Sequence, residues 1–164
     1  MKPALFKHGP RALHALALLT LSVISPASHA YQVGDSVDPQ LLKALNIDNQ
    51  KITLVDFFAS WCTSCKKELP ELDGLRDELA KRGVAIIGID TDKELEKGKQ
   101  FQQKLGLHFP VMDDTEQKVV SQFQPMGMPA LFYLHQGKVV QLRLGAMPHL
   151  AEQIGRDLDA LPHP

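Results

Sequence analysis

The chain has 164 residues, of which 44% are hydrophobic and 23% are charged, and its formal net charge is −1 at pH 7. This length and composition are typical of one soluble globular domain of ordinary size. The nearly balanced charge gives no support to a nucleic-acid-binding protein. The presence of only two cysteines excludes a small scaffold held together by several disulfides.

The first thirty residues have the pattern of a secretory signal peptide. Three basic residues lie within the first eleven positions, residues 12–24 are mainly apolar, and Ser28 and Ala30 stand at the two positions that a signal peptidase reads. An apolar run of about 13 residues is short for a membrane span of roughly 20. Cleavage is therefore favoured over a retained membrane anchor. We expect residues 1–30 to be a signal peptide and residues 31–164 to be one folded domain of an exported protein.

The remaining sequence alternates between apolar runs typical of buried strands and amphipathic runs typical of helices. In chain order we expect a helix starting at Asp38-Pro39, a strand over 51–59, a helix over 68–82 with a kink at Pro70, a strand over 84–89, a helix over 92–105, a short strand or turn at 109–111, a helix over 115–122, strands over 130–135 and 138–144, and a last helix opening at Pro148. The order of these elements predicts an α/β fold, because a strand, a helix and a strand in succession form a right-handed parallel crossover. Gln136-Gly137 between the last two strands predicts a β-hairpin.

The two cysteines, Cys62 and Cys65, stand between the predicted strand 51–59 and the predicted helix 68–82. This is the N-terminal end of a helix, where unpaired N–H groups and the helix dipole favour a thiolate over a thiol. A thiolate is the nucleophile of disulfide exchange, and a Cys-x-x-Cys motif at a helix N-terminus lowers the thiol pKa. The spacing therefore predicts a redox-active pair.

Two other readings of the cysteine pair are weaker. A purely structural disulfide between Cys62 and Cys65 would close a very short loop and so contribute little stability. A zinc site needs at least two more ligands, whereas the chain has no third cysteine and its seven histidines are scattered. Both cysteines of a predicted secreted chain lie in one exchange-competent motif, which indicates an oxidising compartment such as the periplasm.

A resemblance to a known family rests on this motif and two flanking segments. Residues 54–62 read Leu-Val-Asp-Phe-Phe-Ala-Ser-Trp-Cys, Cys65 follows after two intervening residues, and Gly127-Met128-Pro129 comes later. In this order the segments resemble the thioredoxin superfamily. The Cys-x-x-Glu-x-Pro continuation from Cys65 resembles, more narrowly, the extracytoplasmic thiol-disulfide oxidoreductases of the TlpA/ResA type. The resemblance implies the thioredoxin fold, a central mixed β-sheet flanked by helices with a terminal β-hairpin and helix.

The resemblance also implies a role for each residue of the motif. Cys62 is expected to be the attacking thiolate and the more exposed cysteine, and Cys65 is expected to resolve the mixed disulfide from inside. Trp61 is expected to shield one flank of the site, although as the only tryptophan it is also a candidate core residue. In the superfamily the proline at the position of Pro129 is cis and lies against the cysteines. It exposes the backbone of the preceding residue, here Met128, for pairing with a substrate strand.

Two carboxylates are predicted to exchange protons with the cysteine pair. Asp56 lies inside an apolar strand, where an unpaired charge is costly. The resemblance places a proton-transferring aspartate there and a glutamate at Glu68. The lysine that thioredoxins place near this aspartate is replaced here by Ile86. We predict that at least one carboxylate, Asp56 in particular, titrates above about pH 6 and exchanges protons with Cys65. The alternatives are an Asp56 at a water-facing sheet edge and a solvated Glu68.

The predicted function is periplasmic thiol-disulfide exchange through the cysteine pair. The resemblance implies a protein disulfide reductase, with a role in cytochrome c maturation, a membrane thiol reductant as electron donor, no cofactor, no bound metal, and a monomeric state. One alternative is an oxidant that introduces disulfides. Another is copper(I) binding by the two cysteines together with Met126, Met128 or His135, because soft sulfur ligands suit Cu(I).

Overall fold

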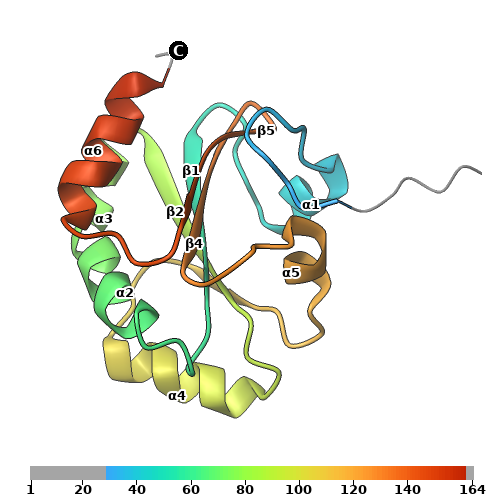
Figure 1. The fold of residues 1–164 in the computed structure, drawn as a ribbon, viewed down its shortest axis with the longest axis vertical. Coiled ribbons are helices and arrows are strands. Elements are labelled where there is room, and N and C mark those ends of the chain that lie inside the picture. Colours follow the sequence, from blue (N-terminus) through green and yellow to red (C-terminus); the bar gives the residue numbers. More distant parts are fainter. Residues whose placement is uncertain (1–28, 162–164) are drawn as a thin grey trace, which may run out of the picture.

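The computed structural model describes residues 29–161, so nearly all of the predicted signal peptide lies outside the described residues. In chain order the elements are α1 (Pro39–Ala44), β1 (Ile52–Phe58), α2 (Cys65–Gly74), α3 (Arg76–Lys81), β2 (Val84–Asp90), α4 (Leu95–Leu105), β3 (Val111–Asp113), α5 (Lys118–Phe123), β4 (Ala130–His135), β5 (Lys138–Leu144) and α6 (Leu150–Ala160). Figure 1 shows the strands in the middle of the molecule and helices on both sides of them. No helix within residues 29–161 is long and apolar enough to cross a membrane.

The five strands form one mixed sheet with the order β3-β2-β1-β4-β5. β1 is the central strand, paired in parallel with β2 and antiparallel with β4. The parallel pair is joined by α2 and α3, and β4 and β5 form the antiparallel hairpin at the end of the sheet. This arrangement confirms the predicted α/β class, with its central mixed sheet, terminal hairpin and last helix.

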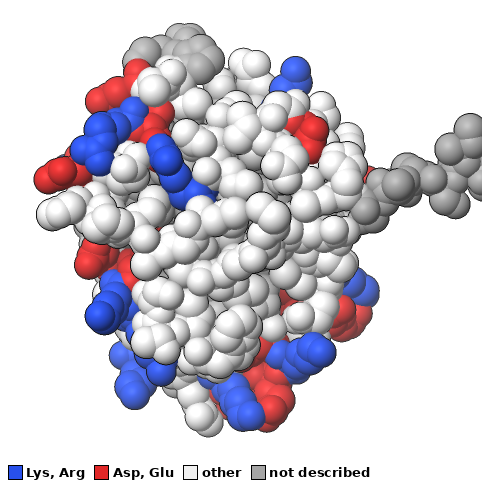
Figure 2. Space-filling view, in the orientation of Figure 1, with Lys and Arg blue, Asp and Glu red and all other residues white. Residues whose placement is uncertain are grey.

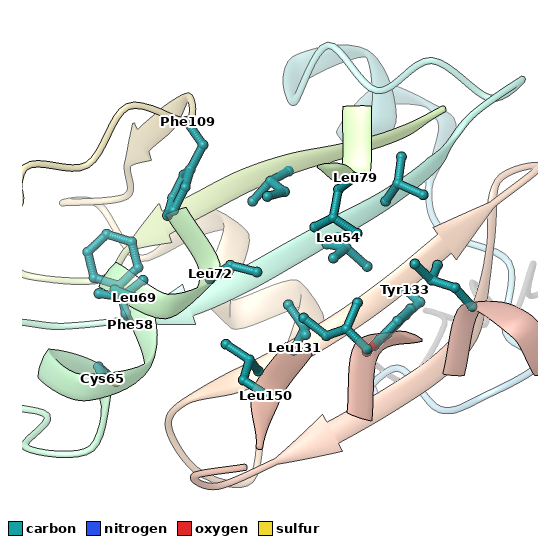
Figure 3. Packing of buried hydrophobic residues seen from close by; sticks show 14 of the residues in the cluster. Leu54, Phe58, Cys65, Leu69, Leu72, Leu79, Phe109, Leu131, Tyr133 and Leu150 are labelled. Carbon is teal, nitrogen blue, oxygen red and sulfur yellow. The ribbon is translucent and has the colours of Figure 1, made fainter. Parts of the chain in front are cut away.

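The central strand β1 divides the core into two layers, because successive side chains of a strand point to opposite faces. Leu54 and Phe58 pack on one face with residues of α2, α3, α4 and α6. Val55 and Phe57 pack on the other face with residues of α1 and α5. Figure 3 shows the first layer, where Leu69, Leu72 and Leu150 lie against the strands. Asp56 is two residues from both Leu54 and Phe58 in the strand, so its side chain points to the same face, the one covered by α2.

The hairpin has the predicted bounds and the predicted turn. Gln136 and Gly137 have φ values of 50° and 73°. Two successive residues with positive φ match the twist of antiparallel strands in a two-residue turn. This places Pro129, immediately before β4, at the opposite end of that strand from the turn.

The helix expected over residues 68–82 is instead two helices. α2 begins earlier, at Cys65, and the interruption between α2 and α3 lies at Leu75. The N–H of Leu75 is shared between the carbonyls of Glu71 and Leu72, which tightens this turn. Pro70, where a kink was expected, lies inside α2.

Three later helices begin after the positions predicted for them. α4 begins at Leu95, because the carboxylate of Asp92 bonds to Ser60 instead of starting the helix. α5 begins at Lys118, and Asp114, not Thr115, accepts hydrogen bonds from the N–H groups at its start. α6 begins at Leu150, two residues after the proline expected to open it. The short strand expected at 109–111 is β3, displaced to 111–113.

Candidate active site

The cysteine pair lies between the end of β1 and the first turn of α2. Cys62 and Cys65 are joined by a disulfide, with their sulfurs 2.03 Å apart. Cys62 is 5% exposed and Cys65 is fully buried. The expectation that Cys62 is the more accessible cysteine therefore holds, although both side chains are covered. The central strand and the helix it feeds thus deliver both cysteines to one end of the sheet.

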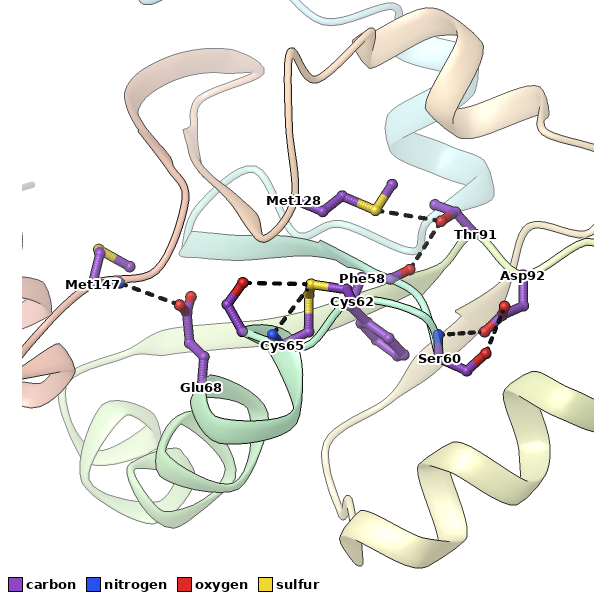
Figure 4. Close-up of a disulfide and its surroundings, with 10 residues drawn as sticks. Phe58, Ser60, Cys62, Cys65, Glu68, Thr91, Asp92, Met128 and Met147 are labelled. Carbon is purple, nitrogen blue, oxygen red and sulfur yellow. Dashed lines mark hydrogen bonds between the residues drawn. A yellow bond between two sulfur atoms is a disulfide. The ribbon is translucent and has the colours of Figure 1, made fainter.

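The N-terminal end of α2 is directed at the sulfur of Cys62. The backbone N–H of Cys65 donates to the Cys62 Sγ at 3.2 Å, and the hydroxyl of Ser64 lies 3.9 Å from the same sulfur (Figure 4). A backbone N–H at a helix N-terminus stabilises a thiolate more than a thiol. Lys66 and Lys67, which follow in α2, are exposed. The helix N-terminus predicted to stabilise a Cys62 thiolate is therefore directed at the Cys62 sulfur.

Trp61 is a surface residue, which corrects the alternative prediction that it belongs to the core. It is 68% exposed immediately before Cys62. Met126, in the segment before the cis proline, is 78% exposed. Figure 2 shows one face of the molecule on which charged side chains gather along the edges and leave the middle uncharged. An exposed indole beside the cysteines leaves apolar surface for another molecule to contact.

The peptide bond between Met128 and Pro129 is cis, as the resemblance implied. Met128 is half-buried and packs against the apolar cluster that contains both cysteines. Its sulfur lies 3.6 Å from the hydroxyl of Thr91, and the Pro129 carbonyl accepts the N–H of Gly145 at 2.8 Å. The structure therefore brings this segment to the cysteines, although 66 residues separate Cys62 from Met128 in the chain.

Asp56 is fully buried on the central strand, so the alternative of a water-facing edge position is wrong. Neither of its carboxylate oxygens has a hydrogen-bond partner among the described residues. Burial raises the pKa of Asp56 well above the usual value for an aspartate, and the charge of Glu68 raises it further. A carboxyl group in this position is protonated over a wide pH range.

Glu68 lies one helical turn after Cys65 and is 5% exposed, so the alternative of a solvated surface glutamate is also wrong. The only hydrogen bond that its carboxylate makes within the described chain is from the N–H of Met147, at 3.4 Å (Figure 4). Burial raises the pKa of Glu68 to about 7, against the lowering effect of the Met147 N–H, and the charge of Glu71 adds to the rise.

A surface groove gives Glu68 contact with solvent that Asp56 lacks. This groove of about 480 Å³ runs between the start of α2 and the segment before α6. It is lined by Thr63, Ser64, Lys67, Glu68, Glu71, Ala146, Met147 and Pro148. Two buried carboxyl groups thus interact with one another, the enclosed Asp56 and, one turn after Cys65, Glu68 at the border of an open groove.

No cation offsets these carboxylates in the interior. Ile86, which stands where thioredoxins have a lysine, pairs with Leu54 and belongs to the buried apolar cluster. Within residues 29–161, no lysine or arginine is buried. Burial is the main influence on the pKa of both carboxylates.

The structure separates one of the alternative copper(I) ligands, His135, from the cysteines, whereas another, Met128, packs against the cluster that contains them. His135 ends β4 at the hairpin turn, whereas Met128 and Pro129 precede the other end of that strand. His135 is therefore separated from the cysteines by the length of β4. In the part of the chain that is described, no group of three or more His, Cys, Asp or Glu side chains is placed to hold a metal ion.

Residues at the carboxyl ends of β1 and β2 also touch the site, and the sequence reasoning missed them. Ser60 follows β1, and Thr91 and Asp92 follow β2. The side chain of Thr91 contacts Phe58 and Met128, and the carboxylate of Asp92 accepts two hydrogen bonds from Ser60. The signal was available, because the carboxyl ends of adjacent parallel strands meet at one edge of a sheet.

Comparison with known proteins places this geometry in a family. Residues 34–143 match the model of the AhpC/TSA family. Over 96 residues, 58% of the chain, the sequence is 33% identical to the thiol-disulfide oxidoreductase ResA of Bacillus anthracis. Over 98 residues, 59% of the chain, it is 29% identical to the ResA protein of Bacillus subtilis strain 168. These matches cover 56% and 55% of the two proteins, so the chain spans little more than half the length of these relatives.

Solved structures share the fold. A putative thiol:disulfide interchange protein DsbE from Chlorobium tepidum matches with a TM-score of 0.64 and 22% identity, over 68% of this chain and 80% of that one. StoA from Bacillus subtilis matches with a TM-score of 0.61 and 23% identity, over 69% of this chain and 86% of that one. Since the family model covers the sheet from before β1 into β5, together with both cysteines, the chain belongs to the AhpC/TSA family, and it shares the fold of the DsbE and StoA structures.

Proposed function

We propose that the protein is a thiol-disulfide oxidoreductase that exchanges disulfides through Cys62 and Cys65 and acts as a reductase of protein disulfides. The observation that carries this proposal is the Cys62–Cys65 disulfide at the N-terminus of α2, with the Cys65 N–H directed at the Cys62 sulfur. The names of the ResA relatives support the same activity. No organic group is required, because the two cysteines carry both electrons.

The reaction takes place in two exchange steps. The Cys62 thiolate attacks one sulfur of a substrate disulfide, whose S–S bond breaks as the mixed disulfide forms, and the released substrate thiolate takes up a proton. Cys65 then loses its proton and attacks the Cys62 sulfur, which breaks the mixed disulfide and releases the second substrate thiol. Two electrons have passed to the substrate, and the Cys62–Cys65 disulfide remains for a dithiol donor to reduce.

The buried carboxylates are proposed to move the proton of Cys65. This thiol is fully buried, so water cannot reach it directly. Glu68 lies one turn along α2 and borders a groove open to solvent. With a pKa of about 7, Glu68 can both accept and return a proton near neutral pH. Asp56 keeps its own proton because burial raises its pKa, and it interacts with the charge of Glu68, so the apparent pKa values belong to the pair.

The activity is tested by trapping. A Cys65→Ser variant mixed with an oxidised protein such as insulin is expected to accumulate a covalent adduct, because its mixed disulfide cannot be resolved from inside. A Cys62→Ser variant lacks the nucleophile and is expected to form no adduct and to lose insulin reduction. Non-reducing mass spectrometry identifies the adduct. Turnover of Cys62→Ser equal to that of the unmodified protein would contradict the proposal.

The direction of electron flow is tested by the reduction potential. Thioredoxin, a reductant, has a potential of about −270 mV, and DsbA, an oxidant, about −120 mV. We expect a value on the thioredoxin side, measured by equilibration with glutathione or dithiothreitol. A value above about −150 mV would favour the alternative, an oxidant that introduces disulfides into other proteins.

We further propose that the protein acts in the periplasm as a monomer, is reduced by a membrane thiol donor, and reduces disulfides of proteins that include apocytochrome c. The signal-peptide pattern of residues 1–30 supports the location, and the ResA-type resemblance supports the substrate class and the donor. A deletion strain that keeps its c-type cytochromes in full amount would contradict the cytochrome assignment without touching the exchange activity.

A further inference from the structure

Thr91 and Asp92, the two residues that directly follow β2, connect the separate segments that form the cysteine site. The backbone N–H of Thr91 donates to the Phe58 carbonyl at 2.9 Å, and its hydroxyl lies 3.0 Å from the same oxygen. The carboxylate of Asp92 accepts the N–H of Ser60 at 2.7 Å and the hydroxyl of Ser60 at 2.9 Å (Figure 4). Both residues therefore hold the segment that runs from β1 to Cys62.

This segment needs external support because it belongs to neither a strand nor a helix. The pairing of β1 with β2 ends at Phe58 and Asp90, and α2 does not begin until Cys65. Within the segment, the N–H of Cys62 bonds to the Ala59 carbonyl at 3.0 Å. The Asp92 carboxylate thus satisfies the Ser60 N–H, which has no strand partner, just two residues before the reacting sulfur.

Asp92 is itself fixed by neighbouring groups. Its N–H donates to the Asp90 carboxylate at 2.9 Å, and the amide of Gln102 in α4 donates to the other oxygen of Asp90 at 2.8 Å. Gly98 in α4 allows this approach, because a side-chain carbon there would collide with Asp90. Asp92 is only 7% exposed, so water does not readily replace its bonds to Ser60.

Thr91 extends the same connection to the cis-proline segment. Its hydroxyl lies 3.6 Å from the sulfur of Met128, the residue before Pro129. The hydroxyl has one proton, and the shorter contact to Phe58 is the stronger hydrogen bond. Thr91 therefore touches both halves of the site, the strand that leads to Cys62 and the segment that leads to Pro129.

We propose that Asp92, supported by Thr91, is a positioning residue for thiol-disulfide exchange that holds the Cys62 sulfur against the N–H groups at the start of α2. This inference rests on the proposed function. Without the Asp92 carboxylate, the segment from Ala59 to Cys62 loses two hydrogen bonds, and the sulfur is no longer held 3.2 Å from the Cys65 N–H. The thiolate of the reduced protein is then less stabilised, and attack on a disulfide is slower.

The negative charge of Asp92, considered without its hydrogen bonds, predicts the opposite change in the Cys62 pKa when Asp92 is replaced. The ionisable side chains on the elements around Cys62 are Asp56 in β1, Lys66, Lys67, Glu68, Glu71 and Asp73 in α2, and Asp90 at the end of β2, with Asp92 following. The segment from Met126 to Pro129 carries none. A nearby negative charge disfavours a thiolate. Loss of charge would therefore lower the Cys62 pKa, whereas loss of positioning raises it, and the sign of the shift separates the two.

The test compares Asp92→Ala with Asp92→Asn in the reduced protein. The alanine removes both contacts to Ser60, whereas the asparagine keeps them, with its amide oxygen accepting the N–H and its amide nitrogen donating to the hydroxyl. The rate of alkylation of Cys62 is measured against pH in a Cys65→Ser background. For Asp92→Ala we expect alkylation at pH 6 to fall at least about threefold, equivalent to a thiol pKa raised by half a unit. Asp92→Asn is expected to show no such fall.

Asp114→Ala is the matched control. Asp114 is 5% exposed, and its carboxylate accepts two backbone N–H groups at the start of α5 and none from the segment that leads to Cys62. Its loss is expected to lower stability and to leave the alkylation profile unchanged. If Asp92→Ala lowers stability like this control without slowing alkylation, or if it speeds alkylation, the positioning role is wrong.

Ser60→Ala keeps the test decisive if Asp92→Ala does not fold. It removes only the hydroxyl contact to Asp92 and leaves the bond from the Ser60 N–H. Alkylation of Cys62 is therefore expected to slow down, but by less than in Asp92→Ala. An unchanged profile in Ser60→Ala would then overturn the proposal. Failure of insulin reduction in the unmodified protein would instead overturn the proposed function, because the alkylation profile of Cys62 does not depend on a protein substrate.

Discussion

Asp56 shows how one buried side chain links stability to function. It lies on the central strand with no hydrogen-bond partner among the described residues, and burial raises its pKa well above the usual value. The native state therefore binds a proton that the unfolded state releases at lower pH. Such a group contributes stability below its unfolded pKa, and that stability is lost as the pH rises through the folded value. This loss of stability comes from a residue of β1, the strand that leads to the redox pair.

Replacement of Asp56 by asparagine is expected to stabilise the protein at pH 8. The amide carries no charge to bury, so the decline in stability with rising pH becomes flatter, and each unit of pKa difference is worth about 1.4 kcal/mol. Urea unfolding at pH 4, 6 and 8 measures the effect. Asp77→Asn, at an exposed position in α3, is the control and is expected to leave the slope unchanged. An equal slope in both variants would show that Asp56 is not the titrating group.

Replacement of Glu68 by glutamine is expected to remove a titration near pH 7 from the resolution of the mixed disulfide. Glu68 has a pKa of about 7, and the glutamine cannot take the proton of Cys65. The measurement is the pH dependence of turnover and of Cys65 alkylation.

Glu71→Gln is the matched control, since Glu71 lines the same groove but is exposed. It is expected to keep the titration and to move it slightly to lower pH, because the Glu71 charge raises the Glu68 pKa. If Asp56→Asn alone changes the profiles, Glu68 has no role in proton transfer. If neither carboxylate variant changes them, the proton-transfer proposal fails as a whole.

At the level of secondary structure, the hairpin β4–β5 and the last helix α6 are joined by one buried carboxylate. Asp157 in α6 accepts hydrogen bonds from the Tyr133 hydroxyl at 2.9 Å and from the guanidinium of Arg143. Gln153 donates a fourth hydrogen bond to it at 3.1 Å. Burial alone would raise the pKa of Asp157, but these hydrogen bonds outweigh it and hold the pKa below the usual value.

Asp157→Ala is expected to lower the free energy of unfolding by about 3 kcal/mol, because it leaves the Tyr133 hydroxyl and the Arg143 charge without their partner. Guanidinium unfolding at pH 7 measures the loss. Asp159→Ala in the same helix removes only an exposed ion pair with Arg82 and should cost less than about 1 kcal/mol. Because the folded pKa of Asp157 is lowered, its contribution is present at pH 7 and lost as the pH falls through the folded value. A difference between the two variants that does not become smaller as the pH is lowered would contradict this assignment.

At the scale of the whole molecule, the described chain begins in contact with the fold. The N–H of Tyr31 donates to the Phe123 carbonyl at 3.2 Å, and the two rings pack edge to face with their centroids 5.1 Å apart. The proposed cleavage after Ala30 would therefore leave Tyr31 as an anchored first residue. We expect the protein recovered from the periplasm to begin at Tyr31, as measured by intact-mass spectrometry. Recovery of the uncleaved chain with the membrane fraction would indicate a retained anchor instead.

The sequence by itself determined the elements whose signals are local. The bounds of β4 and β5 follow from alternating apolar residues around Gln136-Gly137, and the position of Cys62 and Cys65 at a helix start follows from the apolar run before them and the amphipathic run after them. The cis bond before Pro129 came from the family resemblance, because most X-Pro bonds are trans.

Only the tertiary structure decided what each side chain of the site touches. Glu68 is buried because the segment before α6 covers it, with Met147 supplying its hydrogen bond from 79 residues away. Asp92 begins no helix because Ser60, 32 residues earlier, lies at the same edge of the sheet and binds its carboxylate. Trp61, for which a core position was the alternative prediction, faces solvent beside Cys62. Burial and pairing of this kind depend on contacts between distant segments, and the local pattern of residues carries no record of which segment will cover which.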